Sequence, residues 1–212
     1  FVLSLSHDEV VHLKRSLLGK MPGEECERFA NLRLLFALMY AHPGKKLLFM
    51  GGELGQESEW SHETELDWRA LERKPNRALG WYIQDLNRLY RTQPPLHEVD
   101  SRAGGFEWLE ADNAEDSTLA FSRKAKDPRR ALLFAGNFSA ISRPGHRIGV
   151  PYPVTYTVLL NSNDERYGGS GASRHLQVAA AEIPHNGHAF SITLDLPALS
   201  AVILQPAPAE GA

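Results

Sequence analysis

Two acidic clusters in this sequence lie where a short apolar run ends, a place where carboxylates can take part in acid–base or electrostatic catalysis. The run 1–5 leads into Ser6-His7-Asp8-Glu9, and the run 46–50 leads into Gly51-Gly52-Glu53. In a barrel of alternating strands and helices, catalytic groups follow the strands at the C-terminal face. The pattern indicates a catalytic carboxylate after each run. The alternative is that the aspartate only caps a turn.

A long polar loop after the second run carries a second group of candidates, Trp60, Asp67 and Trp68. Aromatic rings beside carboxylates suit sugar binding, because a pyranose has apolar faces and polar edges. The alternative is that both tryptophans pack the loop onto the protein surface.

The secondary structure expected around these residues follows two patterns along the chain. Up to about residue 100 the order is strand, helix, strand, helix, with strands over 1–5 and 46–50 and helices over 24–41 and 78–92. After Gly104-Gly105 the chain changes to short alternating segments separated by turn residues, which is typical of an antiparallel sandwich or barrel. These segments are 106–109, 118–123, 130–137, 146–150, 155–160, 177–183, 189–194 and 200–204.

Composition excludes several classes of partner. The 212 residues carry a formal net charge of -3, which gives no electrostatic reason to expect nucleic acid or a membrane surface as a partner, and a neutral, polar partner such as a sugar fits at least as well. No apolar run approaches membrane-spanning length. The single cysteine allows no internal disulfide and fits a reducing cytoplasm. No cluster has metal-ligand spacing, and no glycine loop is placed to hold a phosphate, so we expect neither metal nor cofactor.

Several linked motifs give the sequence a specific resemblance. It resembles the last third of bacterial 1,4-α-glucan (glycogen) branching enzymes, which belong to the α-amylase superfamily. The motifs are 1–10 (FVLSLSHDEV), 16–23 (SLLGKMPG), 29–33 (FANLR), 42–51 (HPGKKLLFMG), Glu53, Glu59-Trp60 with His62, 66–68 (LDW), 137–138 (NF), 149–151 (GVP) and 167–171 (YGGSG). The match extends to about Leu204.

The resemblance implies a fold. Residues 1–102 would be the C-terminal portion of a catalytic (β/α)8 barrel, namely its last two strand–helix units. Residues 103–206 would form an antiparallel β-sandwich, and residues 207–212 a disordered tail. Because the chain opens on Phe1 inside a strand-like run, we expect it to be part of a longer protein.

The resemblance also implies a reaction: cleavage of an α-1,4-glucan with retention and transfer of the cut chain to a 6-hydroxyl, which makes an α-1,6 branch. Retention needs a nucleophile and an acid/base carboxyl, and in the family both lie upstream of Phe1. Asp8 would be the third carboxylate, which stabilises the transition state, and His7 would hydrogen-bond the same sugar. Glu53 would order its loop or line the cleft, and Trp60, Asp67 and Trp68 would bind substrate.

The chain alone should therefore be inactive, whereas the complete enzyme would be a cytoplasmic monomer acting on glycogen-like glucans. The alternatives are another superfamily transferase or debranching hydrolase, and a non-catalytic glucan-binding or structural fragment. One departure from the family stands out. Leu13-Lys14-Arg15 replaces a usual Gly-Lys-Gly, and losing two glycines should stiffen the loop beside the cleft.

Overall fold

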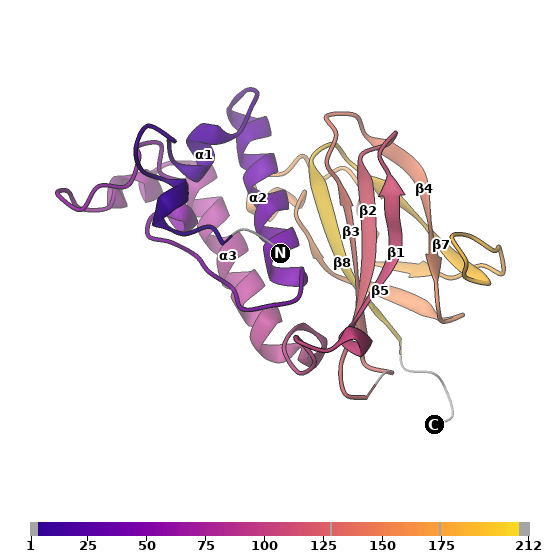
Figure 1. The fold of residues 1–212 in the computed structure, drawn as a ribbon. Helices are drawn as coiled ribbons and strands as arrows, with labels where there is room; N and C mark the ends of the chain where they lie inside the picture. Colours follow the sequence, from indigo (N-terminus) through magenta and orange to yellow (C-terminus); the bar gives the residue numbers. More distant parts are fainter. Residues whose placement is uncertain (1–3, 128, 174, 208–212) are drawn as a thin grey trace.

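The computed structural model describes residues 4–127, 129–173 and 175–207. A helical half lies beside a β half (Figure 1). The helices are α1 (Leu17–Lys20), α2 (Glu25–Ala41) and α3 (Lys74–Thr92), joined by long segments with short 3₁₀ turns. The strands are β1 (Phe106–Asn113), β2 (Thr118–Lys124), β3 (Ala131–Asn137), β4 (Arg143–Val150), β5 (Thr155–Asn161), β6 (Gln177–Ala179), β7 (Phe190–Leu196) and β8 (Ser200–Pro206).

Both expected helices form, and local sequence accounts for their ends. A capping box starts α2, in which the backbone N–H of Glu24 donates to the carboxylate of Glu27 at 2.9 Å. Pro43 follows closely after its last residue, Ala41. Helix α3 begins at Lys74, earlier than the apolar pattern indicates, because Pro75 suits the first turn, where no intrahelical N–H bond is needed.

All eight expected β segments become strands, and every pairing is antiparallel. Six strands form one sheet in the order β1-β2-β3-β8-β5-β6, and β4 pairs with β7 in a second sheet. The two sheets pack face to face around a shared apolar core, which includes Leu133, Ile148, Ile192 and Val202. The expected all-β sandwich is therefore present in residues 106–206.

The outer face of the large sheet is covered by helix α2, which places the helices, the large sheet and the small sheet in three layers (Figure 1). Alternation along β3 shows this arrangement. Leu132 and Phe134 belong to the core shared with the helices, whereas Leu133 and Ala135 belong to the core between the sheets. A strand covered on both faces is buried throughout, as β3 is.

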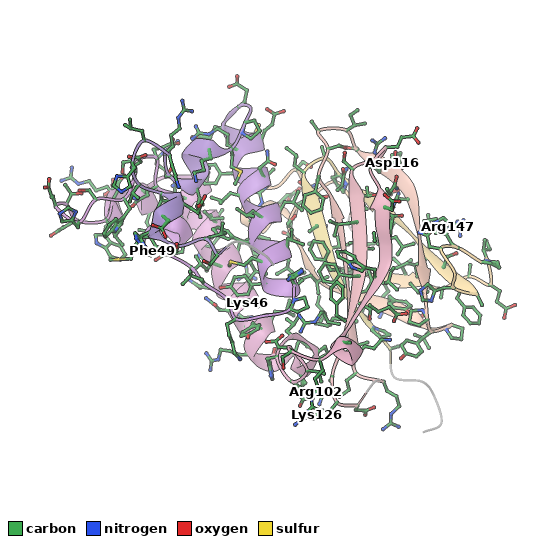
Figure 2. The ribbon with its side chains drawn as sticks, in the orientation of Figure 1. Lys46, Phe49, Arg102, Asp116, Lys126 and Arg147 are labelled. Atoms are coloured by element: carbon green, nitrogen blue, oxygen red, sulfur yellow. The ribbon has the colours of Figure 1, made fainter. Side chains whose placement is uncertain are left out.

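The two strands expected in the helical half do not form. Residues 46–49 have no strand pairing, and Leu47 and Met50 are 39% and 51% exposed. Lys46 and Phe49 lie on the helical side of the molecule (Figure 2). Ser4 and Leu5 are also unpaired, and residues 1–3 lie outside the described part of the chain. A strand needs a neighbour to satisfy its backbone groups, and among the described residues neither segment has one.

Side chains hold the 46–49 segment in place instead. The Lys46 ammonium donates to the carbonyl of His42 at 2.5 Å and lies 5.2 Å from the centre of the Tyr90 ring. Phe49 packs edge-on against Trp60, with ring centres 5.2 Å apart. The expected division at residues 102 and 103 stays a prediction, and residues 208–212 of the expected tail lie outside the described residues.

Candidate functional site

His7 and Asp8 lie together in a 3₁₀ turn, η1 (His7–Glu9), directly after residues 4–6, with which the described chain begins. Their side chains meet, with His7 Nε2 at 3.1 Å from Asp8 Oδ1. The Ser6 hydroxyl donates to Asp8 Oδ2 at 3.4 Å, and the Lys14 ammonium donates to the Asp8 carbonyl at 2.7 Å. Both side chains are largely open to solvent, at 58% and 69% exposed. The pair is thus formed but not enclosed.

A row of aromatic rings runs from His7 into the long loop. His7 lies 6.0 Å from Phe49, Phe49 lies 5.2 Å from Trp60, and Trp60 lies 6.4 Å from His62, each measured between ring centres. The sequence assigned Phe49 only to a buried strand. Its place between the histidine and the tryptophan depends on tertiary contacts that no local pattern records.

The loop after η1 is fastened to the loop that carries Trp60. The Trp60 N–H donates to the Val10 carbonyl at 3.1 Å, and the Arg15 N–H donates to Glu59 Oε1 at 2.6 Å. Glu9 lies 3.4 Å from the Lys20 ammonium, which gives this carboxylate a structural partner. The structure therefore brings His7, Asp8 and Trp60 into one neighbourhood.

Leu13 and Arg15, the two residues that stand where glycines are usual, both keep a left-handed backbone, with φ of 67° and 66°. His12, just before them, has φ of 57°. This conformation costs a residue with a side chain roughly 1–2 kcal/mol. The loop thus keeps a backbone conformation that glycine adopts at little energetic cost, although neither position is a glycine.

Glu53 points elsewhere. It lies in the 3₁₀ turn η2 (Gly52–Leu54), and its Oε2 is buried without a hydrogen-bond partner among the described residues. Burial, with the Glu53 charge nearby, raises the pKa of Tyr40 to about 12. Tyr40 in turn donates to Asn87 at 2.7 Å. The η2 turn contacts α3, and no hydrogen bond or ion pair between described residues joins Glu53 to His7 or Asp8.

Asp67 and Trp68 stand at the start of the 3₁₀ turn η3 (Trp68–Glu72), where both are exposed and Trp68 is 58% open to solvent. Within the described residues no ring contact or hydrogen bond links their side chains to His7, Asp8 or Trp60. Their assignment to substrate binding stays a prediction, as does that of Glu53.

The described ranges hold neither a cluster placed to bind a metal ion nor a helix that could span a membrane. In residues 4–127, 129–173 and 175–207, no group of three or more His, Cys, Asp and Glu side chains is placed to hold a metal ion. Over the same ranges, no helix has both the length and the apolar character needed to cross a bilayer.

Comparison with known proteins identifies what this arrangement resembles. Residues 108–207 match the family described as alpha amylase, C-terminal all-beta domain. The 1,4-alpha-glucan branching enzyme of Rubrobacter xylanophilus is 50% identical over 208 residues, which are 98% of this chain. The branching enzyme of Aquifex aeolicus is 47% identical over 205 residues, or 97% of the chain. The resemblance to branching enzymes is confirmed.

The match to these enzymes is nearly complete for this chain but partial for them. The chain spans 29% of the Rubrobacter xylanophilus enzyme and 32% of the Aquifex aeolicus enzyme, and the matched segment is their C-terminal part. Among solved structures, a debranching enzyme from Nostoc punctiforme aligns with 92% of this chain and 34% of its own, at a TM-score of 0.61 and 18% identity. At that identity the likeness to the debranching enzyme concerns the fold alone.

Proposed function

We propose that the chain is the C-terminal part of a 1,4-α-glucan branching enzyme, which cleaves an α-1,4-glucan and transfers the cut chain to a 6-hydroxyl of glycogen. The observation that carries the proposal is 50% identity to such an enzyme along 98% of the chain. An all-β region matching the alpha amylase C-terminal domain supports it.

The helical half would then be the end of the catalytic (β/α)8 barrel, although its strands are unpaired here. Two segments that form neither helix nor strand, 4–6 and 46–49, precede α2 and α3 in the chain order that strand–helix units require. A barrel strand pairs with the strand on either side of it. Supplying the neighbouring strands would satisfy the backbone of both segments.

Asp8 would stabilise the transition state, and His7 would hydrogen-bond the same sugar. Positive charge develops at the anomeric carbon during retaining cleavage, so a fixed anion binds the transition state more tightly than the substrate. The 3.1 Å contact between His7 and Asp8 gives two polar groups that could grip one sugar ring. Trp60 would add an aromatic surface, continuous through Phe49 with His7.

The same geometry argues that this chain does not catalyse the reaction by itself. Asp8 is 69% exposed, and water weakens the attraction between an anion and developing positive charge. Glu9 is paired with Lys14 and Lys20, and Glu53 Oε2 is buried without a hydrogen-bond partner among the described residues. We propose that the nucleophile, the acid/base and the walls that exclude water come from other barrel segments. The whole enzyme would act in the cytoplasm as a monomer.

A hybrid enzyme tests the proposal. These 212 residues replace the matching segment of the Rubrobacter xylanophilus enzyme, and activity is followed by the fall in amylose–iodine absorbance and by counting new α-1,6 links. We expect the hybrid to branch amylose and the isolated chain not to. A folded hybrid without activity, beside an active parent, would overturn the proposal, as would clear turnover by the isolated chain.

Within that hybrid, Asp8→Asn keeps the shape of the side chain and removes its charge. Loss of one preorganised electrostatic contact lowers the turnover number roughly 100- to 1000-fold, and His7→Ala should have a milder effect. Asp112→Asn is the matched control, because Asp112 is an exposed aspartate on β1. An Asp8→Asn hybrid within threefold of its parent, with an unchanged melting temperature, would end the assignment.

A further inference from the structure

A cavity lies between the N-terminal halves of α2 and α3 and the 3₁₀ turn η6 (Glu165–Tyr167). Its volume is about 550 Å³, within the range of roughly 300–1,000 Å³ found for small-molecule sites. The residues that could bind a ligand there are Arg33, Lys74, Arg77, Trp81 and Arg166. None of them belongs to the candidate site around Asp8.

Arg33 lines this cavity and carries a buried charge without a carboxylate partner. The residue is 3% exposed, and its Nε donates to the Ser162 carbonyl at 2.7 Å. Among the described residues this is the only hydrogen bond of the guanidinium, whose terminal nitrogens have no partner. Burial is the main cause that lowers the pKa of Arg33. A buried cation is costly unless an anion compensates it.

Two further cations lie on the same side of α3. Lys74 and Arg77 line the cavity, are exposed, and form no ion pair with any residue in the described ranges. Arg166 is already matched, because its guanidinium lies 2.9 Å from Asp85. The three cations without a partner therefore converge on one hollow.

The acidic residues near the cavity are occupied elsewhere. Glu25 forms an ion pair with Arg73. Glu165, which like Glu25 lines the cavity, also has an interaction partner and is not a free charge. The excess positive charge at Arg33, Lys74 and Arg77 is thus not cancelled by these two carboxylates, so an anionic ligand fits better than a cationic one.

Trp81 adds an apolar surface to this charged hollow. It follows Arg77 by four residues, which places both side chains on one face of α3. Its side chain is 42% exposed although it is large and apolar. A flat ring can stack on an exposed indole while its anionic group reaches the guanidinium groups.

We propose that this cavity is a binding site for a phosphorylated sugar. The phosphate accepts hydrogen bonds from Arg33 and Arg77, with Lys74 as an additional cation, because guanidinium groups match phosphate oxygens in a bidentate geometry. The pyranose ring lies on Trp81. Neither group alone uses the whole site, so the phosphate ester of a sugar should bind better than inorganic phosphate or a neutral sugar.

Isothermal titration calorimetry on the purified 212-residue chain tests this, with glucose 6-phosphate, inorganic phosphate and maltose as three separate probes. We expect glucose 6-phosphate to bind more tightly than either other probe. Arg77→Gln should weaken its binding about tenfold, because a hydrogen bond to a charged group is lost. Trp81→Ala should weaken the binding of glucose 6-phosphate but leave the binding of inorganic phosphate unchanged.

Arg91→Gln is the matched control, because Arg91 is an exposed arginine near the other end of α3 and does not line the cavity. Both test residues are exposed, and circular dichroism checks that each variant keeps its fold. The proposal is overturned if glucose 6-phosphate gives no binding heat or binds no better than inorganic phosphate. It is also overturned if Arg77→Gln binds as tightly as Arg91→Gln.

Discussion

The helical half and the β half differ in where their backbone partners come from. Each β segment pairs with another segment of residues 106–206, as β3 does with β2 and β8. Segments 4–6 and 46–49 of the helical half pair neither with each other nor with another described segment, although helix α2 lies between them as a parallel crossover would require. Helices α2 and α3 satisfy their own backbones and form regardless. Thus a segment's pattern sets its preference, but a strand forms only where a partner exists.

The two halves nevertheless share one core, and Arg123 of β2 is the clearest link between them. This arginine is 1% exposed; it donates to the Ala41 carbonyl at 2.7 Å, to the Gly105 carbonyl at 3.3 Å and to Asp100 at 2.7 Å. It joins the end of α2 to the start of the β half. If the halves were independent, this contact would matter little.

We predict that Arg123→Ala lowers the free energy of unfolding by about 3–5 kcal/mol, the usual cost of removing one partner of a buried ion pair. Denaturant titration of the chain measures the change. Arg129→Ala is the matched control, since Arg129 is 66% exposed and pairs with the nearby Asp127, and an ion pair on the surface contributes little to stability. Equal effects of the two substitutions would show that the halves do not depend on this link.

The helical half and the β half also differ in how well their structures could be predicted from the sequence. The eight β segments and both helices were predictable, because alternation and helical spacing are local properties that the tertiary packing then uses. The pairing of His7 with Asp8 was predictable for the same reason, since they are neighbours in one turn. The conformation of segment 46–49 was not predictable from the sequence. Its apolar residues give the same pattern whether they belong to a strand or only pack their side chains against the helices.

Long-range placement explains the rest of the candidate site. Trp60 joins His7 only through Phe49 and through its backbone bond to Val10, contacts that depend on how two loops meet. Glu53 was expected from its position to order its loop or line the cleft, and no local pattern indicates that its Oε2 would be buried without a hydrogen-bond partner among the described residues. The cavity at Arg33 had no sequence signal, since a single arginine within a helix is ordinary.

The two halves also differ in how they treat buried charge. In the β half, the buried carboxylate of Glu110 has compensating partners. Glu110 on β1 is 8% exposed, lies 3.1 Å from His146 Nε2, and accepts from the Thr118 hydroxyl at 2.6 Å. Burial acts to raise its pKa, but the hydrogen bonds from His146 and Thr118 outweigh burial, so the pKa of Glu110 is lowered. The folded state therefore favours the ionised form.

The sign of the pH dependence follows from that lowered pKa. At pH values between the folded and the unfolded pKa the unfolded chain binds more protons, so stability rises with pH. Stability from Glu110 is present above the unfolded pKa and is lost as pH falls through the folded pKa. We predict that Glu110→Gln lowers the free energy of unfolding at pH 7 by roughly 1.5–3 kcal/mol, the contribution of hydrogen bonds to a charged group.

Denaturant titrations of the chain and of Glu110→Gln between pH 3 and 7 measure this. The difference in free energy of unfolding between the unmodified chain and Glu110→Gln should shrink as the pH falls below 4.5, the ordinary pKa of a glutamate, because the carboxyl of the unfolded chain is then protonated. A parallel loss at every pH would mean that the charge of Glu110 contributes nothing. Glu107→Gln serves as control, because this glutamate is on the same strand, is 34% exposed and pairs with Lys124.

The smallest effect concerns backbone strain in the helical half, at the loop beside His7 and Asp8. Leu13 and Arg15 hold φ near 67° and 66°, and Leu13 is 94% exposed, so it gains no packing in return. Substitution by glycine removes the cost of about 1–2 kcal/mol for a left-handed residue. It also destabilises the folded state by about 0.4–1 kcal/mol, because glycine raises the conformational entropy of the unfolded chain. The strain relief is the larger of the two.

We therefore predict that Leu13→Gly and Arg15→Gly each raise the free energy of unfolding by about 0.5–1 kcal/mol. Glu65→Gly is the control: Glu65 is an exposed loop residue absent from the left-handed positions, so glycine there should only destabilise. Denaturant midpoints of the three variants decide between the two effects. If all three substitutions destabilise alike, then the loop adopts another conformation in solution. If only the first two stabilise, strain at these two positions is real, and the loop is held in its path by the bonds from Trp60 to Val10 and from Arg15 to Glu59.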